Sequence, residues 1–257
     1  MKEYSEQVIS DLNGDGNYTL DDAGGLMYHS NSALQPYLAA ANLRLVEKDE
    51  NDLPYLITDM TGVEHVFSTM QTMMTTTGCT LDWATFPNAV ADIQSLIDNK
   101  QVLFQNMVLS MVRRLYRDLE ANFGLLPLPK FDETQETYST CYNSAAMLTG
   151  IVQIMVRETD NVGFILEAMA SASYELTDTY LNVCLESKYT RDIESYEMVK
   201  LARENVVIDM SFLYNWGNLG TTLTNAVPSG DSFASKIASL SKVATKTIEK
   251  FVEDLNG

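Results

Sequence analysis

The chain has 257 residues, and 46% of them are apolar, which is enough to bury one or two ordinary hydrophobic cores. Its 35 acidic residues outnumber its 17 basic residues, so the formal net charge is −18. A chain this acidic repels a phosphate backbone unless its cations gather on one face, so neither nucleic acid nor an anionic membrane surface is expected as a partner.

Cations and cysteines form no recognisable site. The tightest basic cluster, Arg113, Arg114 and Arg117, is mixed with acidic residues at helical spacing, which is typical of a solvated helix face. The cysteines are odd in number, far apart and without a C-x-x-C pair. We therefore expect small buried hydrophobic residues and not a disulfide framework or a zinc ribbon.

The first motif along the chain is a polar loop, DLNGDGNYTLDD, over residues 11–22. It fits the twelve-residue EF-type calcium loop, with Gly16 at the sixth position, where the backbone must turn sharply. The residues expected to ligate a structural Ca²⁺ ion are Asp11, Asn13, Asp15, Asn17 and Asp22. The alternative is a solvated turn that holds itself together through Asx side chains without a metal.

Strands and helices are expected to alternate after this loop. A strand is predicted at residues 26–28, and a helix begins at Thr61, where Thr61 and Glu64 have the spacing of a capping box, and ends near Gly78. A second amphipathic helix is predicted at residues 88–99, and it leads into a strand at residues 102–104.

The second half of the chain is richer in helix. Helices are predicted at residues 109–120, 162–174, 179–188, 191–203 and from 232 onwards, and strand-like runs at 123–128 and 206–209. The whole pattern predicts an α/β fold with helix in excess.

Nothing in the sequence indicates an enzyme. His29 and His65 lie in different segments, and the chain has no H-E-x-x-H, G-x-S-x-G, P-loop or G-x-G-x-x-G motif. A pair of carboxylates for glycoside hydrolysis stays possible among so many acidic residues, but nothing singles one out. We therefore expect a protein that binds and does not catalyse.

Several strings along the chain resemble, in order, family 1 extracellular solute-binding proteins of bacterial ABC transporters, the maltose-binding-protein-like group. The strings are LIDNKQVLF (96–104), RDLEANFGLLPLPKFDE (117–133), ILEAMA (165–170) and LESKYTRD (185–192). In the first, Asn99 stands where the family has glycine, and we expect it to adopt the left-handed conformation there.

The resemblance implies a type II periplasmic-binding-protein-like fold with two α/β lobes. Residues 1–135 and 195–257 would form the C-terminal lobe, and residues 136–194 would return to an N-terminal lobe whose remainder is absent, so the chain would be the C-terminal portion of the family's fold. Such a protein captures a solute, here expected to be a carbohydrate, and delivers it to ABC permease subunits. The family is extracellular and lipid-anchored, and an anchor is not part of this sequence.

Sugars require flat aromatic rings and short polar side chains, and the resemblance places such residues at cleft positions. The residues expected to line the cleft are His29, Asn31, Ser32, Asn106, Met107, Tyr214, Asn215 and Trp216. Trp216 is the expected stacking platform, although it could instead fill the core under the last helices. Trp83 is expected to be structural.

A second class of function stays open. The loop at residues 11–22 also resembles the calcium repeat of dockerins, which are interaction modules. A dockerin has two such repeats, and this sequence has one, so solute binding is the favoured prediction.

Overall fold

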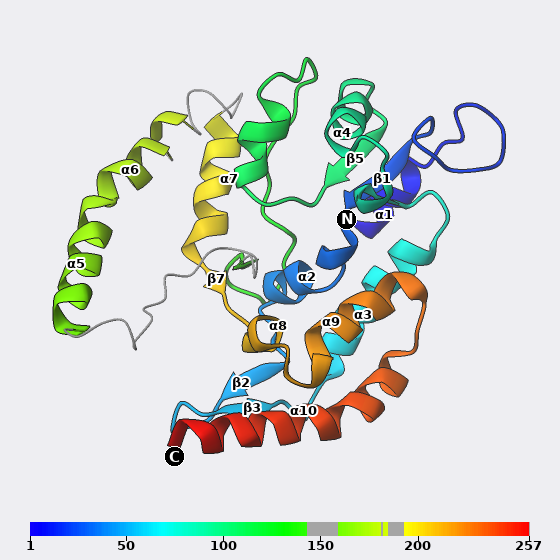
Figure 1. The fold of residues 1–257 in the computed structure, drawn as a ribbon. Coiled ribbons are helices and arrows are strands. Elements are labelled where there is room, and N and C mark those ends of the chain that lie inside the picture. Colours follow the sequence, from blue (N-terminus) through cyan, green and yellow to red (C-terminus); the bar gives the residue numbers. More distant parts are fainter. Residues whose placement is uncertain (143–158, 181, 185–192, 257) are drawn as a thin grey trace.

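The computed structural model describes residues 1–142, 159–180, 182–184 and 193–256. It is an α/β structure rich in helix, with short strands in small sheets (Figure 1). The strands are β1 (Gly24–Tyr28), β2 (Val46–Lys48), β3 (Pro54–Leu56), β4 (Thr80–Asp82), β5 (Val102–Gln105), β6 (Thr140–Cys141) and β7 (Val206–Val207). The helices are α1 (Lys2–Gln7), α2 (Gln35–Ala40), α3 (Thr61–Thr75), α4 (Ala89–Asp98), α5 (Thr159–Ala172), α6 (Tyr174–Asp178), α7 (Ile193–Glu204), α8 (Met210–Tyr214), α9 (Leu219–Ser229) and α10 (Phe233–Asn256).

A parallel sheet of order β4-β1-β5 organises the body of the molecule. All five residues of β1 are buried, as expected for the central strand of a parallel sheet. A side chain at Gly25 would place its Cβ 2.3 Å from the Cβ of Ser5, so glycine lets α1 pack directly on this strand.

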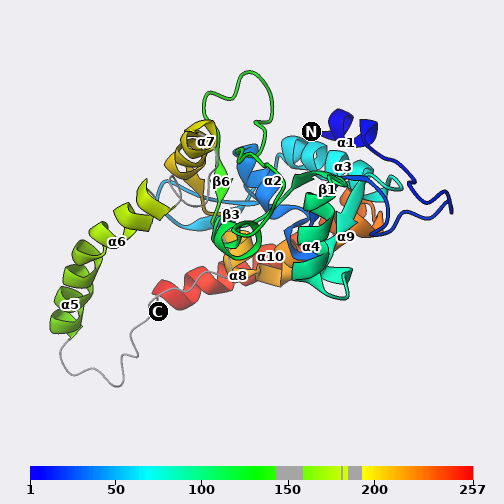
Figure 2. The same ribbon diagram turned by 90° about the horizontal axis from the view of Figure 1, so that it is seen from above.

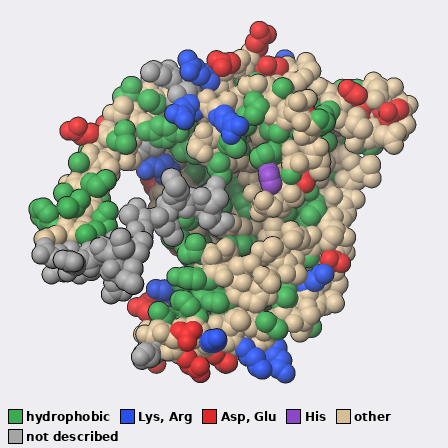
Figure 3. Space-filling view, in the orientation of Figure 1, with side chains coloured by type: hydrophobic (Ala, Val, Ile, Leu, Met, Phe, Trp, Pro, Cys, Tyr) green, Lys and Arg blue, Asp and Glu red, His purple; other side chains and the backbone are tan. Residues whose placement is uncertain are grey.

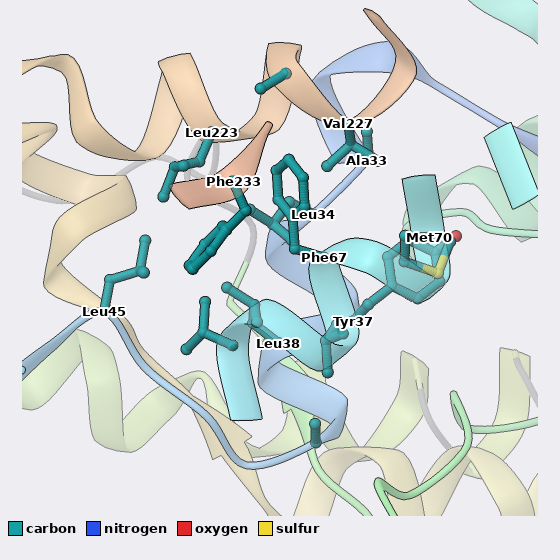
Figure 4. Close-up of a cluster of buried hydrophobic side chains, with 14 of the residues drawn as sticks. Ala33, Leu34, Tyr37, Leu38, Leu45, Phe67, Met70, Leu223, Val227 and Phe233 are labelled. Carbon is teal, nitrogen blue, oxygen red and sulfur yellow. The ribbon is translucent and has the colours of Figure 1, made fainter. Parts of the chain in front are cut away.

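Successive residues of β1 face opposite sides of the sheet and enter two different cores. Leu26 and Tyr28 belong to the larger core, which includes side chains from α2, α3, α9 and α10 (Figure 4). There the rings of Phe67 and Phe233 lie 5.1 Å apart. Met27 points the other way, into a second core with Ile93 of α4 and its neighbours.

The hairpin of β2 and β3 lies against the long helix α10 at the base of the molecule (Figure 1). Val46 of β2 and Ile248 of α10 enclose a third, smaller cluster. Strands β6 and β7 pair in parallel and bring segments far apart in sequence together.

Helices α5 and α6 form an arm at the side of the body in both ribbon views (Figures 1 and 2). Hydrophobic side chains cover much of its visible surface (Figure 3), and Phe164 is 76% exposed. Among the described residues, no helix is both long and apolar enough to cross a membrane.

The α/β class and the strands at residues 26–28 and 102–104 are confirmed, as are the helices that begin at residues 61, 89 and 233. Some details were wrong. Thr61 does not cap its own helix; its amide instead donates to the carboxylate of Asp59 (3.0 Å). Asn99 is right-handed, and the left-handed residue after α4 is Lys100, with φ of 58°.

Two predicted elements differ more clearly. The helix expected over residues 109–120 is reduced to a short helical segment around a π-helical turn, Val112–Tyr116. Residues 123–128 form no strand, because the described structure offers this run no partner strand, and neither Pro127 within the run nor Pro129 after it can donate to a ladder. Part of the helix expected at 179–188, and the string at 185–192, lie outside the described residues.

Candidate functional site

The carboxyl ends of β1, β4 and β5 meet at one edge of the sheet, which we call the carboxyl edge. His29 directly follows β1, Trp83 follows β4 and Asn106 follows β5. The register pairs Tyr28 with Asp82 and Met27 with Gln105, so the three strands end side by side. The rings of His29 and Trp83 lie 4.4 Å apart in an edge-to-face arrangement.

A single carboxylate oxygen fixes two of these strand ends. Oδ1 of Asp82 accepts hydrogen bonds from the amides of Ser30 and Ala84, both at 3.0 Å. Nδ1 of His29 accepts from the amide of Asn31 (3.1 Å). The turns that carry His29 and Trp83 are therefore held by hydrogen bonds from backbone amides to side chains, and the aromatic rings have defined positions.

Two tyrosines support the carboxyl edge. The Tyr37 hydroxyl accepts from Nδ2 of Asn106 at 3.2 Å. Burial, with a contribution from the negative charge of Asp82, raises the pKa of Tyr28 to about 12. Burial also raises the pKa of Tyr37 well above its ordinary value. Both phenols are therefore protonated near neutral pH and can donate as well as accept.

Two buried N–H donors near this edge have no protein acceptor among the described residues. They are Nε1 of Trp83 and Nε2 of Gln105. The Gln105 carbonyl is engaged, because it accepts from the hydroxyl of Tyr116. An unpaired buried donor costs about 1–3 kcal/mol, and both atoms are shielded from solvent, so a ligand reaches them only if the neighbouring side chains move.

The other predicted residues near this edge are placed as follows. Asn31 is exposed, and Ser32 lies in the short 3₁₀ helix Ser30–Ser32, where its amide donates to the carbonyl of His29 (2.7 Å). Met107 is half-buried and packs against the second core. The structure thus brings His29 and Asn106 to one edge, with Asn31 and Ser32 in the adjoining turn.

The predicted residues Tyr214, Asn215 and Trp216 lie in a different environment. Trp216 is only 7% exposed and packs with Val46 and Ile248. Its ring stacks on Tyr214 at 4.9 Å between centroids. Oδ1 of Asn215, a residue in the left-handed conformation, accepts from an amide in the first turn of α9. This placement matches the core-filling alternative for Trp216, and its role as a stacking platform stays a prediction.

Trp83 lies at the carboxyl edge but was not among the predicted cleft residues, because the strand before it was not predicted. Strand β4 has three residues, too few for hydrophobic alternation to be seen. The available signal was Asp82 beside a tryptophan, since an Asp that caps a turn often follows a strand.

The loop at residues 11–22 projects from the body at the upper right of Figure 1. The carboxylate of Asp11 accepts from the amides of Gly14 (2.6 Å) and Gly16 (2.8 Å). Both glycines have left-handed backbones, with φ of 75° and 77°. The side chains of Asn13 and Asp15 each accept a hydrogen bond from the backbone amide two residues further on, at 2.9 and 2.7 Å.

Asp22 closes the loop and is only 1% exposed. Its carboxylate accepts from the amides of Thr19 (2.8 Å) and Leu12 (2.9 Å), and the bond from Thr19 is the main reason that its pKa is lowered. The side-chain amide of Gln101 donates to the carbonyl of Asp22 (3.3 Å), which ties the loop to the start of β5.

Oxygen ligands in this loop fit a hard cation by chemical type. Among the described residues, however, no three His, Cys, Asp or Glu side chains are close enough together to hold a metal ion. The carboxylates of the loop are instead turned towards its own amides.

Comparison with known proteins gives no relationship. No protein-family model matches the chain, and no curated protein or solved structure is significantly similar to it.

Proposed function

We propose that this chain is the solute-binding component of an ABC importer and that it holds a carbohydrate at the carboxyl edge. The observation that carries the proposal is that three parallel strands end together and present His29, Trp83 and Asn106. Open α/β sheets bind ligands outside the carboxyl ends of their strands.

The chemistry of the carboxyl edge suits an uncharged polyhydroxylated ring. Trp83 offers an apolar surface to the face of a sugar, and the side-chain amide of Asn106 offers hydrogen bonds. The charge of Asp82 is already engaged by two backbone amides.

The two tryptophans allow a matched test, since the sequence contains only Trp83 and Trp216. Intrinsic fluorescence would be followed during titration with mono- and oligosaccharides up to tens of millimolar, so that weak binding is also detected. Trp83→Phe should abolish the spectral response, and Trp216→Phe should retain it. A response lost only in Trp216→Phe, or no response to any sugar, would contradict the proposal.

The finer parts of the proposal rest on the sequence strings at 96–104, 117–133, 165–170 and 185–192. They support a two-lobed type II periplasmic-binding-protein-like arrangement, with residues 136–194 in the other lobe. They also support an extracellular, lipid-anchored precursor that contacts membrane permeases. Crosslinking of the protein to a permease in membranes would test the transport role.

We further propose that the loop at residues 11–22 binds Ca²⁺ through Asp11, Asn13, Asp15, Asn17 and Asp22. The support is its ligand spacing and its sharp turn at Gly16. The ion would screen neighbouring carboxylates and fix the entry to β1. The alternative is that such a loop belongs to a dockerin-like interaction module. A pull-down that compares the native chain with variants of the loop would separate this use from a structural role.

Calcium binding is testable by thermal unfolding after chelation. Adding Ca²⁺ at a hundred times its Kd should stabilise the protein by about 2.7 kcal/mol. Asp15→Asn should remove most of this shift. Asp21→Asn, an exposed neighbour outside the ligand set, is the matched control and should leave it unchanged. An equal melting temperature with chelator and with calcium would rule out the metal.

A further inference from the structure

A cavity of about 320 Å³ lies between α6 and α7. None of its lining residues belongs to the sheet β4-β1-β5 or to the carboxyl edge. Its walls include two tyrosines, an aliphatic side chain and several polar groups. The lining residues include Tyr174, Asp178, Asn182, Tyr196, Lys200 and Arg203.

One wall is rigid, because its polar groups satisfy one another. The hydroxyl of Tyr196 donates to Oδ1 of Asn182, and Nδ2 of Asn182 donates to the carboxylate of Asp178. The ring of Tyr196 is 9% exposed, so it is a fixed flat surface at the cavity. The ring of Tyr174, by contrast, is 74% exposed and available to a ligand.

The two cations of the cavity differ in how they are engaged. Lys200 pairs with Glu197 at 3.0 Å and lies 4.4 Å from the centroid of the Tyr196 ring. Arg203 makes no hydrogen bond or ion pair with any described residue. Its guanidinium therefore keeps its full set of donors, and a planar carboxylate is the group that complements them.

We propose that this cavity binds a small monocyclic organic acid, with its carboxylate on Arg203 and its ring against the tyrosines. The volume is at the lower end of that of ligand pockets, which suits a single ring. Flat rings pack favourably on tyrosine, and a carboxylate can accept two parallel bonds from a guanidinium. This site is independent of the carbohydrate site proposed above.

The experiment is calorimetric titration of the whole chain with benzoate, with its neutral isostere benzamide, and with inorganic phosphate. Benzoate should bind at least about tenfold more tightly than benzamide, because only benzoate gains the charge-assisted bonds to Arg203. Phosphate should bind more weakly than benzoate, because it has no ring. Benzamide or phosphate binding as tightly as benzoate, or no benzoate binding at all, would overturn the proposal.

Variants at exposed positions keep the test free of folding defects. Arg203→Gln should weaken benzoate binding by about tenfold or more, and Arg203→Lys should restore part of the loss. Tyr174→Ala should weaken it by roughly two- to tenfold. Arg113→Gln is the matched control, since Arg113 is an exposed arginine that does not line the cavity. Equal affinity in Arg203→Gln and Arg113→Gln would overturn the assignment of the carboxylate to Arg203.

Discussion

Each of the two tryptophans lies in a region where one aspartate carboxylate accepts hydrogen bonds from two backbone amides, but the two regions differ in burial. At the carboxyl edge, Asp82 accepts from the amides of Ser30 and Ala84 beside Trp83. In the region of Trp216, Asp209 accepts from the amides of Leu45 and Ser211, both at 2.8 Å.

The difference between the regions is burial. Asp209 and Trp216 are both at most 7% exposed, and their partners are other protein groups. Trp83 and Asp82 are only half-buried, and the indole N–H of Trp83 has no acceptor among the described residues. In one region the carboxylate and the tryptophan are both enclosed by the protein, and in the other both are partly exposed.

Replacing Trp216 should give the largest loss of stability. Trp216→Ala removes a ring that packs on Tyr214, Phe251 and Val46, and we expect a cost of about 3–5 kcal/mol. Chemical denaturation would measure it. A cost below about 1 kcal/mol would mean that this aromatic cluster is not a core and would remove the contrast with Trp83.

Removing the buried carboxylate of Asp209 should have the next largest effect. Asp209→Ala leaves the buried amide of Leu45 without its acceptor and removes the cap of α8, at a cost of about 1–3 kcal/mol. The equivalent change at the carboxyl edge, Asp82→Ala, should cost less, because its amides can turn to water. Denaturation of the two variants under the same conditions gives the comparison, and equal costs would contradict it.

The native protein and the Asp209→Asn variant should differ in how their stability depends on pH. Desolvation raises the pKa of this carboxyl above its ordinary value of 3.8, so the folded state holds its proton more tightly than the unfolded state does. The stability that protonated Asp209 contributes is fully present below its ordinary pKa of 3.8. It is lost as the pH rises from there through the raised pKa of the folded state. The native protein should therefore lose stability over this window, and Asp209→Asn should lack that slope. Parallel slopes would contradict the raised pKa.

Replacing Trp83 should have the smallest effect on stability and the largest on binding. Trp83→Ala removes a half-buried side chain, at a cost of less than about 2 kcal/mol. If the carboxyl edge is the site, the same change should abolish the binding of sugars. If Trp83→Ala binds sugars as tightly as the native chain, the proposed role of Trp83 in binding is contradicted.

Long periodic elements were predictable from the sequence, because their pattern is repeated many times. Helix α10 keeps its apolar period over 24 residues, and α3 does so over 15. Strand β1 was predictable from its apolar run, whereas β4 was not, because three residues carry no period. Trp83, which was not among the predicted cleft residues, follows this unpredicted strand.

The environment of Trp216 could not be predicted from its neighbours in sequence. Asn215 and Gly217 on either side are typical of an exposed loop. What buries the ring is Val46 and Ile248, which are distant along the chain and meet only when β2 and α10 come together. Likewise, Lys100 takes the left-handed conformation expected of Asn99, because Asn99 is the right-handed C-cap of α4 and the chain turns at the next residue.

The central position of β1 has a consequence for the order of folding. Both strands that flank it, β4 and β5, come later in the chain, so the middle of the sheet is synthesised before either neighbour. Parallel pairing of this kind closes long loops and is slow compared with helix formation. During that interval Leu26, Met27 and Tyr28 are an apolar strand with two unpaired edges, which is the kind of segment that aggregates. We therefore expect the yield of refolding to fall as protein concentration rises, and chaperones that shelter an extended apolar segment to act before β5 has been made.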